Sequence, residues 1–324
     1  MLIGNKVTVF GGTGFVGKAV INELSKAGYE VNVVVRRPER YREMLLFPQA
    51  SLFTLDTFDN TDALIEAIQG SDIVVNLTVD RSTGTEMIAK KALASVAQKI
   101  KSASEKSAVK RVLSLSQIGA STDIHAKKWL GTVGEVDNQM HTVANAKTTI
   151  FKAGLLIGAG DQSTQRYINQ LNKFEILPVP KAAKVVQPLA IKDFAKAVVG
   201  SIKNSDTFGT KLDVVGEERL SLKELAKLTA ELMQKQPLVF GMCSMNARIM
   251  ATLGGLAPIA SSDKALLDMM HADLVSDADF STQFGFVPVS LEKTIAAYAT
   301  PSQMRGRYNY YRKEANRDAQ DLMS

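Results

Sequence analysis

The sequence of 324 residues predicts an α/β protein with a doubly wound parallel sheet and a smaller C-terminal α/β region. Apolar strand-like segments alternate with amphipathic helical segments at a spacing of roughly 20 to 40 residues, which is typical of this fold class. The segment 30–35 is almost continuous β-branched sequence, as a strand buried on both faces requires. Right-handed crossovers then place the loops after the strands at one edge of the sheet.

The first half of the chain supplies the expected strands and helices of this sheet. Strands are expected at residues 6–10, 30–35, 51–55, 72–77, 111–116 and 148–152. Helices are expected at residues 14–27, 61–68, 84–104 and 133–142. Gly28 and Gly70 are suited to end the first two helices in the left-handed conformation, and Thr61 or Asp62 can cap the second.

Beyond Gly158 the segments become shorter and are interrupted by proline. Short apolar segments lie at 174–180 and 185–189, a strand is expected at 211–215, and helices are expected at 193–203, 221–235, 242–256, 263–271 and 291–298. Ser221 with Glu224 forms a capping-box pattern, and Ser290 is suited to cap the last helix. The predicted organisation is a cofactor domain over 1–160, an interwoven cleft or lid region over 161–300, and a basic, tyrosine-rich tail over 301–324.

Composition narrows the class of protein. Hydrophobic residues make up 45% and charged residues 22%, so a buried core is expected and global disorder is not. The net charge of +6 permits contact with phosphates, acidic partners or anionic lipid, but no basic stripe interleaved with aromatics predicts a nucleic-acid partner. The single Cys243 indicates a reducing compartment, and no apolar run approaches the roughly 18 residues of a membrane helix. We expect a cytoplasmic protein, with peripheral attachment to the inner face of a membrane as a further option.

A glycine-rich loop follows the first strand and opens the first helix. Gly11 permits the tight turn, Gly14 lets the backbone approach a pyrophosphate, and Gly17 lets the helix pack closely. Backbone N–H groups and the positive helix end would meet the phosphates. The context predicts a Rossmann-type dinucleotide site; a merely tight strand-to-helix turn is the alternative. The expected phosphate-binding residues are Gly11, Gly12, Thr13, Gly14, Phe15, Val16 and Gly17.

The end of the second strand indicates which dinucleotide is bound. An NAD-specific site places an acidic residue there, whereas this chain has Arg36 and Arg37. A guanidinium can hold a 2′-phosphate, so NADP(H) is predicted over NAD(H); two solvated arginines are the alternative. Asp56 follows the third strand and either accepts from the adenine amino group or is a turn residue. The end of the fourth strand, where ribose and nicotinamide pass, adds Asn76, Leu77 and Thr78.

These segments together resemble the extended and atypical short-chain dehydrogenase/reductases. The similarity is greatest to the branch that contains the dinucleotide-binding accessory subunit of respiratory complex I and its bacterial, epimerase-like relatives. The matching segments are residues 9–17, 115–120, 149–161, 187–195 and 284–292. Lys152-Ala153 stands where the family usually has Arg-Pro, and Ala159 stands where it has proline. The resemblance implies NAD(P) binding that includes Ser116 and Lys152, and a place in a membrane-associated respiratory or quinone redox assembly.

The acid–base pair of this fold, Tyr-x-x-x-Lys on one helix face, is absent from the sequence. Alignment on Gly134-Glu135 puts Lys127 at the tyrosine position and Gly131 at the lysine position. Ser116 is then the one remaining catalytic candidate, with a strand-end hydrogen bond as the alternative. We therefore predict a structural or regulatory cofactor binder. The alternatives are an active reductase, epimerase or isomerase with a non-standard acid, and a redox sensor that binds a protein according to cofactor state.

The histidines, the methionine-rich helices and the C-terminal tail support weaker predictions. His125 and His141 are lone histidines, more often structural than catalytic, and three histidines with one cysteine form no metal-ligand pattern, so no metal is expected. The methionine-rich helices are expected to form an adaptable core or lid, with a groove for a lipid or quinone tail as the alternative. The tail is either solvated or docks on an anionic membrane surface or a protein partner.

Overall fold

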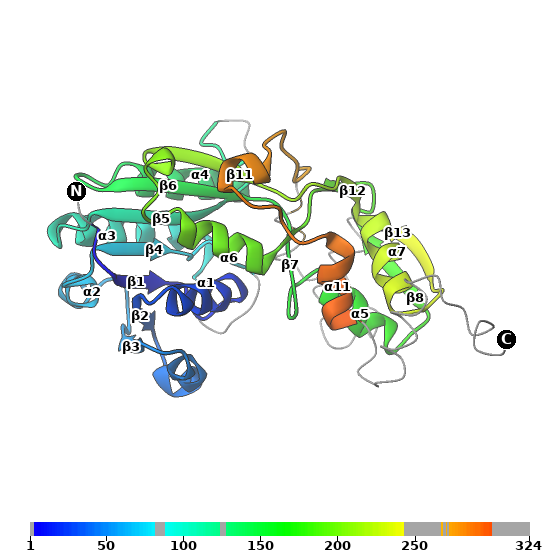
Figure 1. Cartoon of the computed structure of the whole chain (residues 1–324), viewed down its shortest axis with the longest axis horizontal. Helices are drawn as coiled ribbons and strands as arrows, with labels where there is room; N and C mark the ends of the chain where they lie inside the picture. The colour runs from blue at the N-terminus through cyan, green and yellow to red at the C-terminus, as the bar shows by residue number, and fades with distance from the viewer. Residues whose placement is uncertain are drawn as a thin grey trace.

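The computed structural model describes residues 3–81, 88–123, 128–242, 267, 270 and 272–299. Its centre is a seven-stranded sheet in the order β11-β6-β5-β4-β1-β2-β3, in which every neighbouring pair is parallel (Figure 1). The strands are β1 (Lys6–Phe10), β2 (Glu30–Val35), β3 (Ala50–Thr54), β4 (Ile73–Asn76), β5 (Arg111–Gln117), β6 (Lys147–Ala153) and β11 (Thr210–Val214). The predicted doubly wound α/β fold is confirmed.

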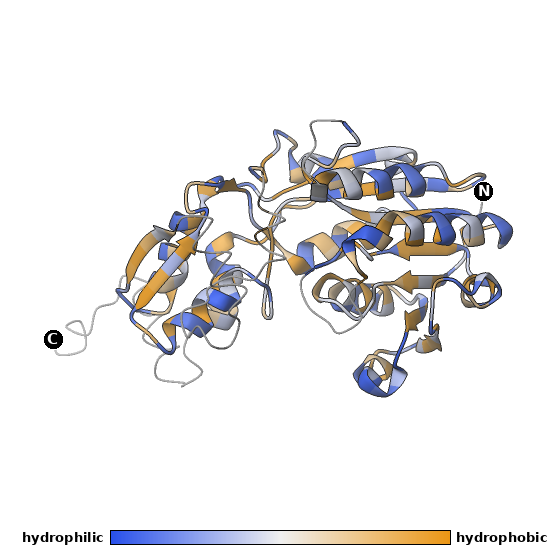
Figure 2. Cartoon of the chain, turned by 180° about the vertical axis from the view of Figure 1, so that it is seen from behind, coloured by the Kyte–Doolittle hydropathy of each residue, from blue (hydrophilic) through white to orange (hydrophobic). Residues whose placement is uncertain are grey.

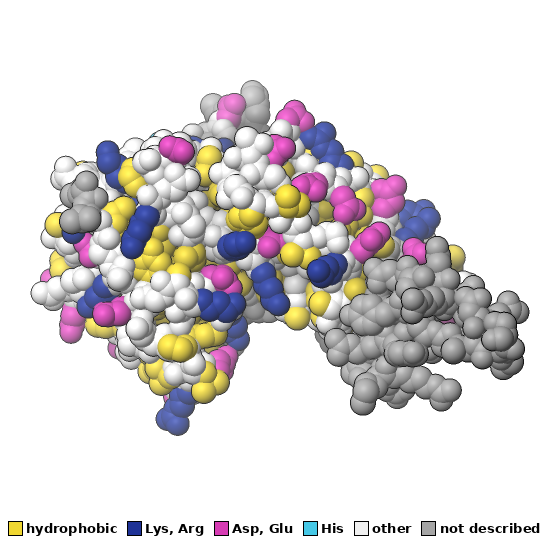
Figure 3. All heavy atoms as spheres, in the orientation of Figure 1, with side chains coloured by type: hydrophobic (Ala, Val, Ile, Leu, Met, Phe, Trp, Pro, Cys, Tyr) yellow, Lys and Arg dark blue, Asp and Glu magenta, His cyan; other side chains and the backbone are white. Residues whose placement is uncertain are grey.

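Helices cover both faces of the sheet. The helices are α1 (Phe15–Lys26), α2 (Thr61–Ile68), α3 (Leu93–Lys106), α4 (Lys128–His141) and α6 (Ile191–Gly200). One apolar cluster joins the sheet to α1 and α6, and a second joins it to α2, α3 and α4. Figure 2 shows apolar strands between amphipathic helices, and the two clusters make the sheet the middle layer of three. Basic and acidic side chains are interspersed on the face shown in Figure 3.

The C-terminal region packs around a third apolar cluster beside the sheet. Its helices are α5 (Thr164–Leu171), α7 (Leu222–Leu232) and α11 (Leu291–Ala299), whereas α10 (Phe280–Phe284) packs on the cluster that joins the sheet to α1 and α6. Its short strands are β7 (Leu156–Ile157), β8 (Ile176–Pro180), β9 (Val185–Val186), β10 (Leu189–Ala190), β12 (Leu220–Ser221) and β13 (Leu238–Met242). Single 3₁₀ turns occur at η1 (Pro38–Arg40), η2 (Arg42–Leu46), η3 (Lys90–Ala92) and η4 (Ser205–Thr207). Although they follow residue 160, β11 is a strand of the central sheet and α6 covers one of its faces.

Several helix ends have the caps that their residues predict. Gly28 and Gly70 adopt φ +79° and +73°, as expected for left-handed residues after a helix. The capping box of α7 is present: Ser221 N donates to Glu224 Oε2 at 2.7 Å and Glu224 N donates to Ser221 Oγ at 3.2 Å. Lys293 N donates to Ser290 Oγ, as expected at the start of α11.

Other expected boundaries are wrong. Asn60, not Thr61 or Asp62, caps α2, because Asn60 is extended and its Oδ1 accepts from Ala63 N at 3.1 Å. The helix expected over 84–104 is not continuous, since Ala89 is extended at φ −59° and ψ 137° and is followed by η3 and α3; residues 84–87 lie outside the described residues. Helix α4 starts at Lys128 rather than 133, and α5 was not expected. A further helix was expected to begin at Met242, but Met242 is the last residue of the strand β13. Residues 243–266 and the tail lie outside the described residues.

Candidate functional site

The glycine loop between β1 and α1 has the close contacts that its sequence predicts. Gly11 adopts φ +77°, and a Cβ there would lie 2.7 Å from the Leu77 carbonyl. A Cβ on Gly17 would lie 2.4 Å from the Gly12 carbonyl, so α1 packs directly on its own loop. Gly12 faces the interior, where a Cβ would meet Ile21 and Val33 side chains within 2.8 Å. A side chain at any of these three positions would overlap neighbouring atoms, so each position requires glycine.

A carboxylate already lies at the start of α1. Val16 N donates to Asp80 Oδ2 at 3.0 Å, and a Cβ on Gly14 would lie 2.4 Å from the same oxygen. This backbone N–H belongs to the helix end that binds phosphates in dinucleotide sites. A pyrophosphate placed here would displace Asp80 from Val16, because two anions cannot share one donor at that distance. The sequence reasoning missed Asp80, although it follows β4 at the same sheet edge as the loop.

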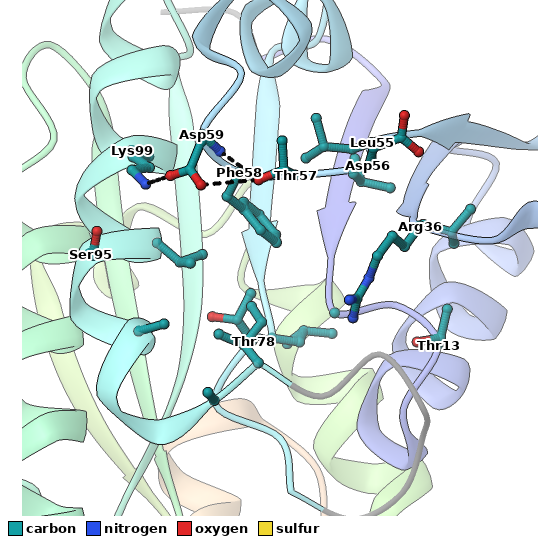
Figure 4. A pocket seen from close by; sticks show the side chains of 18 of the residues that line it. Thr13, Arg36, Leu55, Asp56, Thr57, Phe58, Asp59, Thr78, Ser95 and Lys99 are labelled. Carbon is teal, nitrogen blue, oxygen red and sulfur yellow. Dashed lines mark hydrogen bonds and ion pairs between the residues drawn. The ribbon is translucent and has the colours of Figure 1, made fainter.

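The first cavity lies over the loop and has a volume of about 450 Å³, within the range of small-molecule sites. It contains seven of the predicted cofactor-binding residues, namely Gly11, Thr13, Gly14, Arg36, Asp56, Leu77 and Thr78. Figure 4 shows Arg36 reaching from the end of β2 toward the middle of the cavity, with Phe58 and Thr78 near it. Asp59 pairs with Lys99 at the cavity wall. The sequence therefore located this cavity, but missed its contributors from α3 and the segment after Asp56.

Several predicted residues lie elsewhere. Arg37 is exposed at the start of η1 and is not among the described residues that line the first cavity. Asn76 is buried, and its Oδ1 accepts from Thr78 N at 3.2 Å and Thr78 Oγ1 at 2.7 Å, so it shapes the turn after β4. Lys152 is half-buried on β6 and donates to Ala120 O at 3.3 Å.

A second, smaller cavity of about 60 Å³ lies on the other side of the loop. Phe15 and Val16 of the loop line it, and Ser116 and Trp129 face it from β5 and α4. Asp80 lines both cavities, so the two meet at the start of α1. The start of α1 thus brings Ser116, which lines the second cavity, close to the predicted loop residues, which line the two cavities.

Ser116 donates a hydrogen bond to the Asp137 carboxylate of α4, with an Oγ–Oδ2 distance of 2.7 Å. Both side chains are 2% exposed, and Asp137 Oδ1 has no hydrogen-bond partner within the described chain. Burial raises the pKa of Asp137 to about 6, although the Ser116 hydrogen bond and the nearby Lys152 and Lys211 lower it. Ser116 and Lys152 are register partners on β5 and β6, so these groups form one cluster.

The sequence reasoning did not find Asp137. A signal was available, because Asp137 lies among the apolar residues Val133, Val136 and Met140 that face the core at helical spacing. A carboxylate on such a face must be paired or neutralised.

The Asp137 carboxyl makes stability depend on pH. Its pKa is about 6 in the folded protein and 3.8 ordinarily, so ionisation in the fold costs about 3 kcal/mol. Stability is therefore lost as pH rises from about 4 through about 6. We expect Asp137→Asn, which cannot ionise, to gain about 3 kcal/mol relative to wild type across that window. Urea unfolding at both ends of the window measures this change, and an equal difference at the two pH values would contradict it.

The Asp161 side chain lines the second cavity and holds the surrounding segment through several hydrogen bonds. Its carboxylate accepts backbone N–H groups from Gly158 at 3.0 Å, Ser163 at 2.7 Å and Gln165 at 3.1 Å. The hydroxyl of Tyr298 on α11 also lies 3.4 Å from it, and burial followed by the Asp161 charge raises the pKa of that phenol. One buried carboxylate thus joins the cavity wall to α5 and α11.

The remaining candidates contribute little to either cavity. Lys127 and His125 lie outside the described residues. Gly131 is half-buried on α4. His141 ends α4 beside the Thr148 hydroxyl at 3.3 Å, and burial followed by Lys211 lowers its pKa. Within the described ranges, no group of three or more His, Cys, Asp or Glu side chains could hold a metal ion.

The fold and the glycine loop define a Rossmann-type α/β domain. Residues 11–152 match the NAD(P)H-binding family model. Over 295 residues the chain is 25% identical to the NADH dehydrogenase [ubiquinone] 1 alpha subcomplex subunit 9, mitochondrial, of Rattus norvegicus, covering 85% of this chain and 76% of that protein. The resemblance drawn from the sequence is confirmed.

Two solved structures share the fold. A nucleoside-diphosphate-sugar epimerase from Staphylococcus aureus aligns with a TM-score of 0.71 and 17% identity, covering 90% of this chain and 100% of that one. An NADPH-dependent quinone oxidoreductase from Escherichia coli, complexed with NADPH, aligns with a TM-score of 0.68 and 17% identity, covering 90% and 99%. In the part of the chain that the structure describes, no helix is long and apolar enough to cross a membrane.

Proposed function

We propose that this chain holds NADP(H) in the first cavity and acts as a cofactor-binding component of a membrane-associated redox assembly. The observation that carries the choice of cofactor is Arg36, which lines the cavity where an NAD site would place an acid. The glycine loop would hold the phosphates, Arg36 the 2′-phosphate and Asp56 the adenine. The cofactor, when bound, supplies a hydride donor or acceptor. Its role here is structural or regulatory, since the sequence lacks the Tyr-x-x-x-Lys pair.

The residues present fit such a cofactor with one adjustment. There is no room for a side chain at Gly11 or Gly17. Glycine is the residue expected where a ligand must approach the backbone of a loop closely. Asp80 must leave Val16 N before a phosphate can bind there. Cofactor binding therefore includes a local rearrangement after β4, which gives a regulatory role a physical basis.

Removal of the Arg36 guanidinium tests the cofactor assignment. We expect Arg36→Ala to weaken NADPH binding roughly ten- to a hundredfold, because charge-assisted hydrogen bonds contribute about 1.5–3 kcal/mol, and to leave NADH binding unchanged. Isothermal titration calorimetry with both cofactors measures this. Arg42→Ala is the matched control, since Arg42 is exposed on η2 and is not among the described residues that line the cavity. Equal or tighter NADH binding by wild type would refute the NADP(H) preference.

The place in a redox assembly is supported by the likeness to the mitochondrial NADH dehydrogenase subunit over most of the chain. Affinity purification from native membranes, with nucleotide analysis of the eluate, tests it. Co-purification of respiratory or quinone-reducing subunits and NADP(H) is expected. Recovery from the soluble fraction alone would contradict the proposal. Peripheral attachment from the cytoplasmic side, through the basic tail on an anionic surface, stays a prediction, because residues 301–324 lie outside the described residues.

A second candidate function is an active NAD(P)-dependent reductase, epimerase or isomerase with a non-standard acid. One observation favours it: Ser116 faces the second cavity and shares a short hydrogen bond with the buried Asp137. A buried carboxyl beside a cavity is the arrangement that tunes an acid for proton transfer.

A further inference from the structure

The second cavity lies where the reacting end of a bound dinucleotide would be directed. Gly11, Thr13 and Gly14 line the first cavity, whereas Phe15 and Val16 line the second. A dinucleotide whose phosphates meet the start of α1 therefore has one half in the first cavity and the other half turned toward the second. Ser116 lies on that second wall, at the carboxyl end of β5.

We propose that Ser116 and Asp137 form a proton relay that protonates the oxygen of a small carbonyl compound in the second cavity. The proposal rests on the cofactor binding proposed above and deepens the second candidate function, because it gives the chain an acid in place of the missing tyrosine. It replaces a purely structural or regulatory role of the cofactor with a catalytic one. Ser116 touches the substrate and is the catalytic residue. Asp137 acts through Ser116 and is a positioning residue.

The hydrogen bond between the two side chains can run in either direction. With Asp137 ionised, Ser116 donates to Oδ2 over 2.7 Å, and its proton is directed away from the cavity. With Asp137 protonated, the carboxyl donates to Ser116 over the same contact, and the serine proton becomes available to the cavity. Asp137 Oδ1 has no hydrogen-bond partner among the described residues, and an unsatisfied buried carboxylate oxygen favours the protonated state.

The cavity wall limits the class of substrate. Phe15, Trp129 and Leu155 provide an apolar surface beside the carboxylates of Asp80 and Asp161, which disfavour an anion, and about 60 Å³ leaves room for only a few heavy atoms. Trp129 Nε1 donates to Gln117 Oε1 at 2.6 Å, so the ring is fixed. These features fit a small, uncharged aldehyde or ketone.

The reaction balances with NADPH as the reductant. A hydride passes from NADPH to the carbonyl carbon, the C=O π pair moves to oxygen, and the Ser116 hydroxyl gives that oxygen its proton. Ser116 regains a proton from the Asp137 carboxyl, which regains one from solvent. One carbonyl compound, one NADPH and one proton therefore yield one alcohol and one NADP⁺.

The charges around Asp137 set the pH dependence of the relay. Ser116 faces it from β5, Lys152 acts on it from β6 and Lys211 from β11. Burial outweighs these groups and raises the pKa of Asp137 to about 6. Since the protonated form supplies the proton, carbonyl reduction is expected to fall as pH rises through about 6.

The test measures NADPH oxidation by the full chain with diacetyl or butanal, with NADPH affinity determined separately for each variant. Wild type is expected to form the alcohol and to lose rate above about pH 6. Ser116→Ala is expected to lower the rate roughly a hundredfold or more, because a positioned acid contributes about 10²–10⁴-fold. Ser116→Thr keeps the hydroxyl and should retain turnover. Asp137→Asn should lower the rate and remove the pH dependence below neutrality.

Ser104→Ala is the matched control, since Ser104 is 1% exposed on α3, its hydroxyl donates to Ile100 O at 2.7 Å, and it is not among the described residues that line either cavity. Its turnover should equal that of wild type. Turnover by Ser116→Ala at the wild-type rate would overturn the relay, as would NADPH binding without oxidation by either probe, which leaves the proposed cofactor role intact. Failure to bind NADPH at all would overturn both. The serine variants decide the question even if Asp137→Asn does not fold.

Discussion

Gly17→Ala is expected to destabilise the protein by about 3 kcal/mol and to weaken NADPH binding more than tenfold, because the added methyl overpacks the loop. Its Cβ would lie 2.4 Å from the Gly12 carbonyl and 2.5 Å from Gly11 O. Both are backbone atoms between β1 and α1, so neither can move aside as a flexible side chain could. Relief requires that α1 shift away from the loop, which displaces the N–H groups that would meet the phosphates.

Gly200→Ala is the matched control for this prediction. Gly200 ends α6, and apart from its chain neighbours and its own helix backbone, no atom of the described residues lies within 4 Å of the position that its Cβ would occupy. The control is expected to be neutral or to stabilise the protein by about 0.5–1 kcal/mol through helix propensity. Urea unfolding and calorimetry with NADPH separate the two effects. If Gly17→Ala behaved like Gly200→Ala in both measurements, the close packing of α1 on its loop would be contradicted.

The central sheet could be predicted because its causes are local in the sequence. Val31, Val33 and Val35 of β2 are buried by the helices that the alternating pattern supplies. The edge at which the loops meet follows from right-handed crossovers, so Gly11, Arg36 and Thr78 could be assigned to one site before their positions were known. All three residues line the first cavity, so strand order and crossover handedness determine much of which residues lie together there.

The parts that could not be predicted depend on contacts between distant segments. Asp80 bonds to Val16 across 64 residues, and Asp137 bonds to Ser116 across 21. Arg111 looks like an ordinary strand residue, yet it is fully buried and donates to Ser201 O at 2.9 Å, 90 residues away. No local pattern encodes these partners. The parallel pairing of β8 with β13 is unpredictable for the same reason, since each strand is short and lacks a turn signal that links it to the other.

Asp161→Ala is expected to destabilise the protein by about 4 kcal/mol, because each buried donor left unsatisfied costs about 1–3 kcal/mol. The carboxylate is 4% exposed and accepts three backbone N–H groups, together with the hydroxyls of Ser163 and Thr164. Loss of the carboxylate also removes the acceptor that lies 3.4 Å from the Tyr298 hydroxyl and leaves that hydroxyl its 2.6 Å contact with Thr164, so α11 should loosen from α5.

Asp279→Ala isolates what a single cap is worth. Asp279 caps α10 through one strong bond, from Thr282 N to Oδ1 at 2.7 Å, so its loss should cost about 1 kcal/mol. Hydrogen exchange provides a local measurement: Asp161→Ala should speed exchange in α5 and α11, whereas Asp279→Ala should change only the turn around α10. Equal destabilisation by the two variants would show that Asp161 is no more than a helix cap. The larger loss is expected because the buried Asp161 carboxylate contacts the second cavity, α5 and α11 at once, whereas Asp279 caps one short helix.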